Sequence, residues 1–407
     1  MKLGIIIPGI QPVPAVNGGA VEVLIEEIIN QNEIYKNFEI DLYTIPDSRY
    51  IKDKYNNCKI IEVKANFFEK TCTFFKKAFY KFILRKKTDF TIKSLNYTLA
   101  LRRKLKNSKV YYDYILLENN MSIYESLKST IIMKCKKLIF HLHNDILGTD
   151  KPYNLCNDII NNSAKVLTVS KYLQNRMKAI NNSNNIEVFY NCVDFNVFDE
   201  KRVNIKKIDG IKKKYNILKQ DYVFLYTGRI TEKKGVLNLI EAFKKLIEEN
   251  KNCKLIIVGN SWFGKKKKNE FEKKLEVSSN ELKNKIIFTG YIPHNEIPKM
   301  LSLVDCVAIP SKWEEPFGVV ALEAMAMAKP IIATNSGGLV EQLDSKCAII
   351  VDKNTNLTEN LYKAMKKMKN DKYYGIELGK NAYKKVHAID DFNSENYYKN
   401  FVKILKN

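Results

Sequence analysis

The sequence predicts an α/β protein made of two doubly wound domains, each with a parallel sheet. Three observations carry this prediction: short apolar runs alternate with amphipathic segments, the alternation stops in a polar, lysine-rich joint at 198–220, and it then starts again. Such alternation favours parallel sheets with helices on both faces. We therefore expect Rossmann-like domains at 1–200 and 201–385, with a C-terminal helix in 386–407 that packs back towards the first domain.

Twelve apolar runs have the length and composition of buried strands. In the first half they lie at 3–7, 40–44, 114–117, 138–142, 166–169 and 187–190. In the second half they lie at 223–227, 254–258, 286–289, 306–309, 331–333 and 348–351. Apolar residues at 236, 239, 240, 243, 246 and 247 have the spacing of a helix that buries one face. Ligands of open parallel sheets bind beyond the carboxyl ends of the strands, so the strand ends are the places to search for chemistry.

Composition excludes several classes of protein. A hydrophobic fraction of 45% and a charged fraction of 28% are those of a globular protein and not of a disordered chain. No uncharged apolar run is long enough to span a membrane, and the first apolar run is too short for a signal peptide, so we expect a cytoplasmic protein. The eight cysteines include no Cys-x-x-Cys pair, which argues against a zinc ribbon, a thioredoxin-like site and a disulfide framework.

The positive charge is concentrated in one segment. The whole chain carries +23, and residues 59–109 hold 15 basic and three acidic residues, a net charge of +12, with aromatic residues between them. A basic, aromatic-rich amphipathic stretch suits the surface of an anionic membrane. Binding of nucleic acid and a general compositional bias towards lysine are the alternatives. We predict peripheral binding to the cytoplasmic membrane face and no nucleic-acid partner.

Two loops have the composition of phosphate-binding segments. Gly18 and Gly19 precede a helix that starts near Ala20, where backbone N–H groups and the helix dipole favour an anion; a plain tight turn is the alternative. Arg229 and Lys234 stand five residues apart across a strand-to-helix turn. Two cations without an acidic partner would suit a diphosphate, held by bidentate contacts from Arg229 and by the point charge of Lys234.

The segment 310–326 is the most informative in the chain. It runs from a strand into a helix that we expect to begin near Phe317 and Gly318 and to be apolar apart from Glu323. A buried carboxylate is costly unless it is hydrogen-bonded, and the two hydroxyls of a ribose would satisfy Glu323. Glu315 stands at the mouth of the helix. The alternative is structural: Glu315 would be a capping acid and Glu323 a member of a buried ion pair.

These residues resemble the motifs of the retaining family 4 glycosyltransferases, which have the GT-B fold. The resemblance rests on Glu315-x7-Glu323, on the element Gly228-Arg229-x4-Lys234-Gly235 and on Gly337-Gly338. Weaker matches are Val169-Ser170 followed by a tyrosine, the stretch 190–194 with Phe198, and Gly290-Tyr291-Ile292. The likeness runs from the Gly18-Gly19 loop to past Glu341, which is nearly the whole chain.

The resemblance implies a role for each matching residue. Arg229 and Lys234 would hold the donor diphosphate, Glu323 the ribose of the nucleotide, and Glu315 the hydroxyls of the transferred sugar. His143 matches the histidine of the first domain that lies near the sugar in this family. The remaining donor-binding residues would be Gly18, Gly19, Phe317, Gly318, Gly337 and Gly338.

A metal site is the rival interpretation of the histidines. His141 and His143 would lie on one face of a strand, as in some metal-dependent hydrolases. The other two histidines, His294 and His387, are far away in sequence, and no helical His-Glu-x-x-His motif exists. The chain also lacks any Asp-x-Asp motif, which the other large glycosyltransferase fold uses to hold a metal with its donor. We therefore predict neither a metal nor a cofactor, with the nucleotide sugar as a co-substrate.

The predicted function is transfer of a sugar, with retention of configuration, from a nucleotide-diphosphate-sugar donor to a hydroxyl acceptor. The acceptor we expect is a lipid-linked or growing surface polysaccharide glycan. A nucleotide-sugar epimerase of the same fold and a non-catalytic polysaccharide-binding protein are the alternatives. The intact set of Arg229, Lys234, Glu315 and Glu323 argues against the last.

Overall fold

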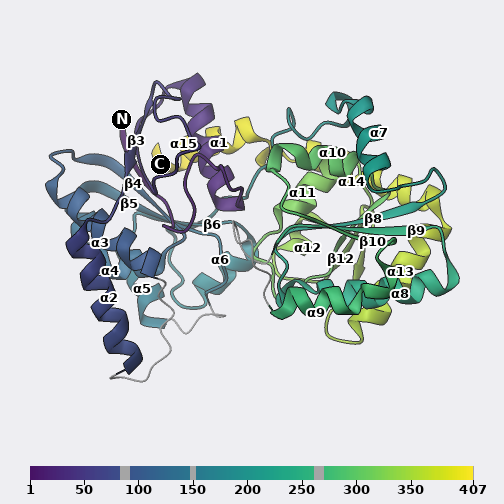
Figure 1. Ribbon diagram of the computed structural model, residues 1–407. Helices are drawn as coiled ribbons and strands as arrows, with labels where there is room; N and C mark the ends of the chain where they lie inside the picture. Colours follow the sequence, from purple (N-terminus) through teal and green to yellow (C-terminus); the bar gives the residue numbers. More distant parts are fainter. Residues whose placement is uncertain (83–91, 147–152, 261–269, 407) are drawn as a thin grey trace. The chain divides into compact units, whose positions relative to one another are not determined.

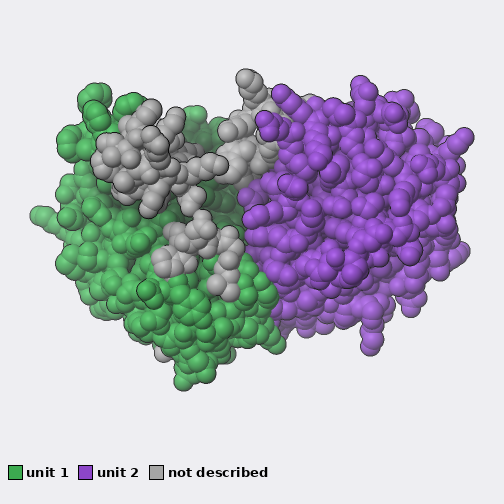
Figure 2. Space-filling model, turned by 90° about the horizontal axis from the view of Figure 1, so that it is seen from below, with its two compact units in different colours: residues 1–189, 397–407 green, residues 190–396 purple. Residues whose placement is uncertain are grey.

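The chain forms two compact units. The computed structural model describes residues 1–82, 92–146, 153–260 and 270–406. Residues Met1–Phe189 and Tyr397–Asn407 form unit 1, and Tyr190–Asn396 form unit 2 (Figure 2). Each unit contains its own parallel sheet and its own buried core, so each is described separately.

Unit 1 contains a seven-stranded sheet in which every described pairing is parallel. Its order is β3-β2-β1-β4-β5-β6-β7, so the chain starts in the middle of the sheet, winds to one edge and then returns to wind to the other. The strands are β1 (Lys2–Ile6), β2 (Glu39–Thr44), β3 (Cys58–Glu62), β4 (Tyr112–Glu118), β5 (Cys135–Leu142), β6 (Lys165–Thr168) and β7 (Ile186–Val188). This is the doubly wound arrangement that the strand–helix alternation predicts.

Helices lie on both faces of the first sheet (Figure 1). The helices of this unit are α1 (Ala20–Tyr35), α2 (Phe67–Phe82), α3 (Ile92–Asn107), α4 (Met121–Ile132), α5 (Tyr153–Asn162), α6 (Lys171–Lys178) and α15 (Ser394–Lys406). The last of these, α15, begins in unit 2 and packs in unit 1, where Tyr398 donates to the Asn32 side chain of α1 at 2.7 Å and Phe401 lies against Phe38. The C-terminal helix thus covers the same face as α1.

Unit 2 contains a six-stranded sheet, also parallel at each described pairing, of order β10-β9-β8-β11-β12-β13. Its strands are β8 (Tyr222–Thr227), β9 (Cys253–Val258), β10 (Ile286–Gly290), β11 (Cys306–Ile309), β12 (Ile331–Thr334) and β13 (Ala348–Val351). The winding direction reverses between β8 and β11, which are neighbours in the sheet. The loops that follow these two strands carry the residues predicted to bind the donor, as expected for a switch point of a doubly wound sheet.

The helices of unit 2 also lie on both faces of its sheet (Figure 1). They are α7 (Ile205–Lys214), α8 (Val236–Glu249), α9 (Glu270–Ser278), α10 (Ile297–Ser302), α11 (Val319–Ala326), α12 (Leu339–Gln342), α13 (Leu357–Asn370) and α14 (Lys372–Ala388). Short 3-10 helices lie at Glu200–Arg202, Glu232–Lys234, Asn280–Leu282, His294–Glu296 and Asp390–Phe392. The predicted apolar face of 236–247 is buried in α8, where Leu239, Ile240 and Phe243 are fully inaccessible to solvent.

Two details differ from the predictions. Strand β3 has no predicted counterpart, because it is an edge strand whose residues apart from Cys58 are only half buried or exposed and so lack an apolar run. Helix α11 begins at Val319 and not at Phe317, because Gly318 takes a left-handed conformation (φ 97°) and breaks the helical path before it. Among the described residues, no helix has both the length and the apolar character needed to cross a bilayer.

Candidate functional site

The loop between β11 and α11 holds Glu315 at the centre of a buried polar cluster. The Glu315 side chain is 5% exposed, and its Oε1 lies 2.6 Å from Nζ of Lys234. The Trp313 indole Nε1–H donates to the same oxygen at 3.0 Å, and the Ser311 hydroxyl also donates to it. A short loop thus brings one carboxylate against three donors, of which only Lys234 comes from another part of the chain.

The charge state of Glu315 follows from these contacts. Burial alone would raise the pKa of this carboxyl, but the Lys234 ammonium and the Ser311 and Trp313 hydrogen bonds hold its pKa below the usual range. The expectation that Lys234 lacks an acidic partner is therefore wrong. An ammonium has three N–H donors, so one contact with Glu315 leaves the others able to bind an anion.

Lys234 is held by its aromatic neighbour and by the backbone beneath it. Its Nζ lies 5.5 Å from the centre of the Trp313 ring, and Lys233 lies over the same ring at 5.7 Å. Gly235 follows with a left-handed backbone (φ 69°), and a Cβ at this position would lie 1.8 Å from the carbonyl oxygen of Pro310. Only glycine allows the two loops to approach this closely, which is why the lysine is followed by glycine.

Arg229 lies on the same strand-to-helix connection but is exposed. Its carbonyl oxygen accepts the Tyr226 hydroxyl at 2.7 Å, which fixes the backbone at this point. Within the described part of the chain, the guanidinium has neither a hydrogen bond nor an ion pair. Arg229 and Lys234 therefore differ: the lysine is paired with a buried carboxylate, and the arginine is not.

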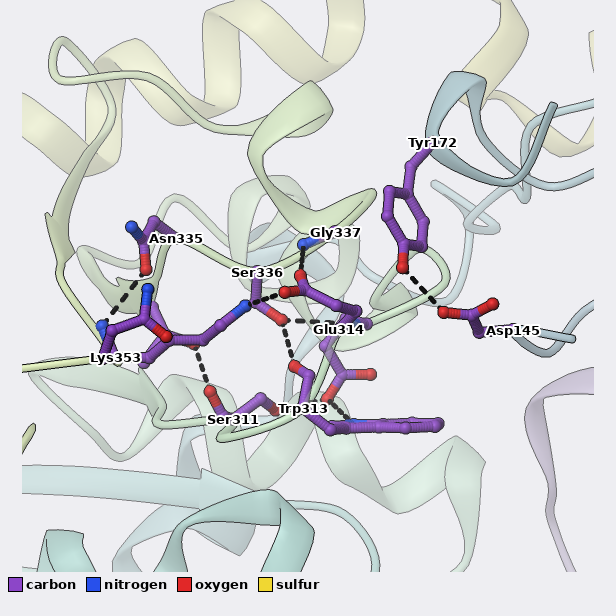
Figure 3. A network of polar contacts seen from close by, with 12 residues as sticks. Asp145, Tyr172, Ser311, Trp313, Glu314, Asn335, Ser336, Gly337 and Lys353 are labelled. Atoms are coloured by element: carbon purple, nitrogen blue, oxygen red, sulfur yellow. Dashed lines mark hydrogen bonds and ion pairs between the residues drawn. The ribbon is translucent and has the colours of Figure 1, made fainter. Parts of the chain in front are cut away.

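The Gly337-Gly338 loop packs directly on the backbone of Glu315. Gly338 N–H donates to the Glu315 carbonyl at 2.7 Å, and a Cβ on Gly337 would lie 2.4 Å from that carbonyl oxygen. Glu314 joins the two loops, since its carboxylate accepts the Gly337 N–H at 2.6 Å and also pairs with Lys353 (Figure 3). The loop after β12 is thus fixed against the loop after β11 by both backbone and side-chain contacts.

Ser336 and Gln342 complete the anchoring of these loops. Ser336 Oγ accepts the Glu315 N–H at 2.9 Å and donates to the Trp313 carbonyl (Figure 3). Gln342 Nε2 donates to the Phe317 carbonyl at 2.6 Å, and the Phe317 ring is 1% exposed. Phe317 therefore acts as a buried anchor for the loop that leads into α11.

Glu323 lies one full turn inside α11 and is buried, as predicted. It already has a partner within the protein: His294 Nε2 lies 2.7 Å from its Oε1. Burial would lower the pKa of His294, but the hydrogen bond and the charge of Glu323 raise it above its usual value. The structural alternative for Glu323, membership of a buried ion pair, describes this contact, and a ribose would have to share or displace it.

The glycine loop of unit 1 has the expected backbone but also an acidic neighbour. Gly18 and Gly19 have φ values of 67° and 110°, and α1 begins directly after them. A Cβ on Gly19 would lie 2.3 Å from Oε2 of Glu22, whose carboxylate occupies the first turn of α1. Glu22, which no motif in the sequence singled out, places a negative charge beside the predicted phosphate loop.

His143 follows β5 and lies in a second buried cluster. Its Nε2 is 2.9 Å from Oε2 of Glu118 and 3.1 Å from Nδ1 of His141. The histidine rings face each other with centroids 3.9 Å apart, as expected for residues on one face of a strand. These three side chains form a group of the kind that could hold a metal ion. Close by in sequence, Asp145 accepts the Tyr172 hydroxyl of α6 at 2.7 Å (Figure 3).

Sequence reasoning missed several residues of these clusters. Ser311, Trp313 and Glu314 stand inside the segment 310–326, but nothing in their spacing showed that their side chains turn towards Glu315 or Gly337. Glu118 directly follows the predicted strand 114–117, which was a usable signal, because carboxyl ends of neighbouring strands meet at one edge of a sheet. His294 was weighed only as a metal ligand and not as the partner of Glu323.

Several known proteins are similar to this chain in sequence. Residues 207–385 match the family model for glycosyl transferases group 1. The protein YtcC of Bacillus subtilis, named as a glycosyltransferase, is 26% identical over 402 residues, which cover 96% of this chain and 89% of YtcC. The lipopolysaccharide 1,2-N-acetylglucosaminetransferase of Salmonella typhimurium is 30% identical over 228 residues, 56% of each chain. The comparisons support a group 1 glycosyltransferase.

Solved structures support the predicted fold. The Anabaena protein HepE, crystallised in complex with UDP and glucose, has a TM-score of 0.74 and 18% sequence identity, with 100% of this chain and 99% of that chain covered. At this level of identity the likeness concerns the fold alone. The fold class predicted from the sequence, the two-domain α/β architecture called GT-B, is confirmed.

Proposed function

We propose that this glycosyltransferase transfers a sugar, with retention of configuration, from a nucleotide-diphosphate donor to a hydroxyl of a lipid-linked or growing surface glycan. The observation that carries the donor assignment is the Lys234–Glu315 cluster, where a cation with spare N–H donors lies beside a buried carboxylate. The lysine ammonium would bind the diphosphate, and the carboxylate would accept hydrogen bonds from the sugar hydroxyls. The UDP and glucose of the HepE complex are consistent with such a donor.

Each residue has a chemical task in this proposal. The leaving diphosphate gains negative charge as the glycosidic bond breaks, and Arg229, Lys234 and the N–H groups at the start of α11 would stabilise that charge. Glu315 would accept hydrogen bonds from sugar hydroxyls, and Glu323 from the ribose. The Gly337-Gly338 loop would hold the Glu315 backbone in place, since the N–H of Gly338 donates to the Glu315 carbonyl.

In this mechanism the sugar keeps its configuration without a carboxylate nucleophile. The acceptor hydroxyl would attack the face from which the diphosphate leaves, and the departing phosphate oxygen would take its proton. No metal is needed, because Arg229, Lys234 and backbone N–H groups neutralise the leaving group. A GT-B epimerase would share the donor site, and so would differ only in the fate of the sugar.

Thermal unfolding with a panel of nucleoside diphosphates tests the donor assignment. A ligand that binds the native state alone raises its stability by about 2.7 kcal/mol at 100 times its Kd. We expect the nucleoside diphosphate of one base to raise the unfolding temperature of the wild type. The Arg229→Ala and Lys234→Ala variants should not show this rise. NMR of the anomeric proton in the product then tests retention. A wild type that no nucleoside diphosphate stabilises would contradict the proposal.

Membrane docking is the second part of the proposal, and α2 is its basis. Phe67, Phe68, Phe74 and Phe75 are 86%, 74%, 64% and 66% exposed, whereas Glu69 and Thr73 on the other face are buried. Four exposed phenylalanines on one helix form an apolar surface that water solvates poorly. The predicted basic segment 59–109 includes residues 83–91, which lie outside the described part of the chain.

A basic hollow lies near this helix along edge strand β3. It is lined by Lys52, Lys59, Ile60, Ile61, Glu62, Lys64, Arg103 and Lys104, which include five cations and one acid. Arg103 also pairs with Glu69 of α2 at 2.8 Å, so the hollow lies next to this helix. Anionic headgroups would bind in the hollow while the exposed Phe side chains of α2 enter the interface, at about 1 kcal/mol per basic residue near the surface.

Co-sedimentation with vesicles of anionic and of neutral lipid, at low and high salt, tests the docking surface. We expect the wild type to bind anionic vesicles at low salt only, since the screening length falls to about 3 Å at 1 M. A Lys59/Lys64/Lys104→Gln variant should lose binding. A Lys212/Lys213/Lys214→Gln variant, which removes three lysines from α7 in unit 2, is the matched control and should bind normally. Equal loss in both variants would refute a specific surface.

A further inference from the structure

The hydrogen bonds that the described residues make to the Glu315 carboxylate all fall on one of its two oxygens. Oε1 accepts from Nζ of Lys234 at 2.6 Å, from the Trp313 indole N–H at 3.0 Å and from the Ser311 hydroxyl. Oε2 makes no hydrogen bond within this part of the chain, and it is not fully buried. A carboxylate oxygen has about two acceptor sites, so three donors saturate Oε1. A substrate hydroxyl that binds Glu315 must therefore bind Oε2.

Trp313 contacts both charged groups of this cluster. Its indole N–H donates to the carboxylate, and its ring centre lies 5.5 Å from Nζ of Lys234, within the distance at which an aromatic face attracts a cation. A lysine side chain is a flexible stem, so one contact with a carboxylate still leaves several positions open to the ammonium. The ring restricts these positions. One side chain thus sets the place of the cation relative to the carboxylate.

The backbone holds Trp313 in place from both sides. Ser336 Oγ donates to the Trp313 carbonyl and accepts the Glu315 N–H at 2.9 Å (Figure 3). On the other side, the Lys312 N–H donates to the Lys233 carbonyl at 2.8 Å. These bonds tie the segment that carries Trp313 to the loops after β12 and β8. The position of the indole is therefore set by the fold of unit 2, before any ligand binds.

We propose that Trp313 is a positioning residue of the donor site: its indole N–H holds Oε1 of Glu315 and its ring holds the Lys234 ammonium, so that Oε2 is the oxygen presented to the sugar. This inference rests on the proposed function, in which Lys234 binds the diphosphate and Glu315 the sugar hydroxyls. Trp313 does not touch the reacting atoms and acts only through these two residues. Its N–H thus serves the sugar, and its ring serves the diphosphate.

Packing alone is the alternative role for Trp313, and the two roles predict different losses. A side chain that only fills space would, when changed, weaken all ligands of the site together. Loss of the N–H of a positioning residue weakens only ligands that reach the carboxylate. Tyr362 of α13 is a matched control in the same unit, because its hydroxyl also donates to a carboxylate, that of Glu249. Its ring also has two lysines over it, Lys245 at 6.0 Å and Lys366 at 5.6 Å.

Titration calorimetry with UDP and UDP-glucose separates the two roles; GDP and GDP-mannose replace this pair if the thermal panel selects guanine. Trp313→Phe keeps an aromatic ring for Lys234 but removes the N–H donor. We expect its affinity for UDP-glucose to fall roughly tenfold, as for a lost hydrogen bond, and its affinity for UDP to stay within about twofold of the wild type. Trp313→Leu also removes the ring, so both affinities should fall, by roughly threefold or more. Tyr362→Phe should change neither.

A second measurement needs no ligand. The chain has two tryptophans, and the indole N–H signal of Trp313 in nitrogen-15 NMR spectra is the one that Trp313→Phe removes. Glu315→Ala takes away the acceptor of this N–H, so the signal should shift, whereas Tyr362→Phe should leave it in place. The double variant Trp313→Phe/Glu315→Ala should bind UDP-glucose within about twofold of Glu315→Ala alone, because effects of residues in contact are not additive. Unfolding curves show that each variant is folded.

The outcomes separate this inference from the proposed function. Equal losses of affinity for UDP and UDP-glucose in Trp313→Phe would overturn the inference, as would no loss for either. An indole signal that stays in place in Glu315→Ala would also overturn it, and so would additive losses in the double variant. A wild type that binds no member of either probe pair, but shows the expected indole shift, would instead refute the proposed donor site.

Discussion

The contact between Lys234 and Glu315 predicts that removing each partner changes the affinity for a nucleoside diphosphate in opposite directions. If Lys234 binds the diphosphate and Glu315 binds the sugar, Glu315→Gln should tighten binding of a nucleoside diphosphate that carries no sugar. A phosphate bound to the ammonium would lie roughly 5 Å from the carboxylate, and two such charges repel by about 3 kcal/mol at an effective dielectric of 20. Allowing for rearrangement, we expect affinity to rise about tenfold, which is about 1.4 kcal/mol.

Lys234→Ala should weaken the same binding by tenfold or more and also destabilise unit 2. Removing one partner from a buried pair costs about 3–5 kcal/mol, because a charge stays buried without compensation. The Lys234 side chain is 22% exposed, so solvent reduces this cost. We expect the variant to lose roughly 2–4 kcal/mol of stability, in the lower part of that range. Without the lysine, the pKa of Glu315 should rise, since burial then dominates over the remaining hydrogen bonds.

Isothermal titration calorimetry gives the affinities, and denaturant unfolding gives the stabilities. Lys233→Ala is the matched control: Lys233 lies over the same Trp313 ring but makes no ion pair with a described residue, so its loss should cost no more than about 0.5 kcal/mol. The reasoning is refuted if Glu315→Gln weakens binding as much as Lys234→Ala does. Equal effects of Lys233→Ala and Lys234→Ala on affinity would also refute it.

Three further outcomes are expected. Arg229→Ala should lower the transfer rate by about 10²-fold or more. Its stability should stay within about 0.5 kcal/mol of the wild type, since the side chain is exposed. Turnover assays measure the first effect and unfolding curves the second. The His294–Glu323 pair should stabilise the fold fully below the unfolded histidine pKa of about 6.5. This stabilisation should be lost as pH rises through the raised pKa of His294 in the folded protein. His294→Gln should abolish this pH dependence in unfolding measured across that range. Transfer should continue in EDTA, and a strict requirement for an added divalent ion would contradict the proposed leaving-group chemistry.

The fold was predictable because most strands are buried on both faces. Strands such as β11 read as continuous apolar runs, and their alternation with helices such as α8 fixes the parallel topology. β3 escaped prediction for the opposite physical reason, since an edge strand has less of its surface covered and needs fewer apolar residues. The strands that the sequence predicts best are thus those that are most buried.

The site was predictable in its composition but not in its pairings. Glu315 and Lys234 both stood out in the sequence, yet 81 positions separate them, and only the neighbouring positions of β8 and β11 bring their loops together. Glu118 and His143 meet across neighbouring strands for the same reason. Spacing along the chain reports local geometry, whereas these contacts depend on the order of strands in the sheet.

The pairing of Lys234 also changes which residue supplies net positive charge. Lys234 and Glu315 together are neutral, so the attraction they exert on a dianionic diphosphate at a distance is that of a dipole and falls off steeply. Arg229 has no described carboxylate partner, and its exposed guanidinium keeps a full charge. Long-range attraction of the donor, and its dependence on salt, should therefore follow Arg229, whereas Lys234 acts at contact distance. The two cations that the sequence presents as a matched pair thus have different physical tasks, one in capturing the diphosphate and one in holding it.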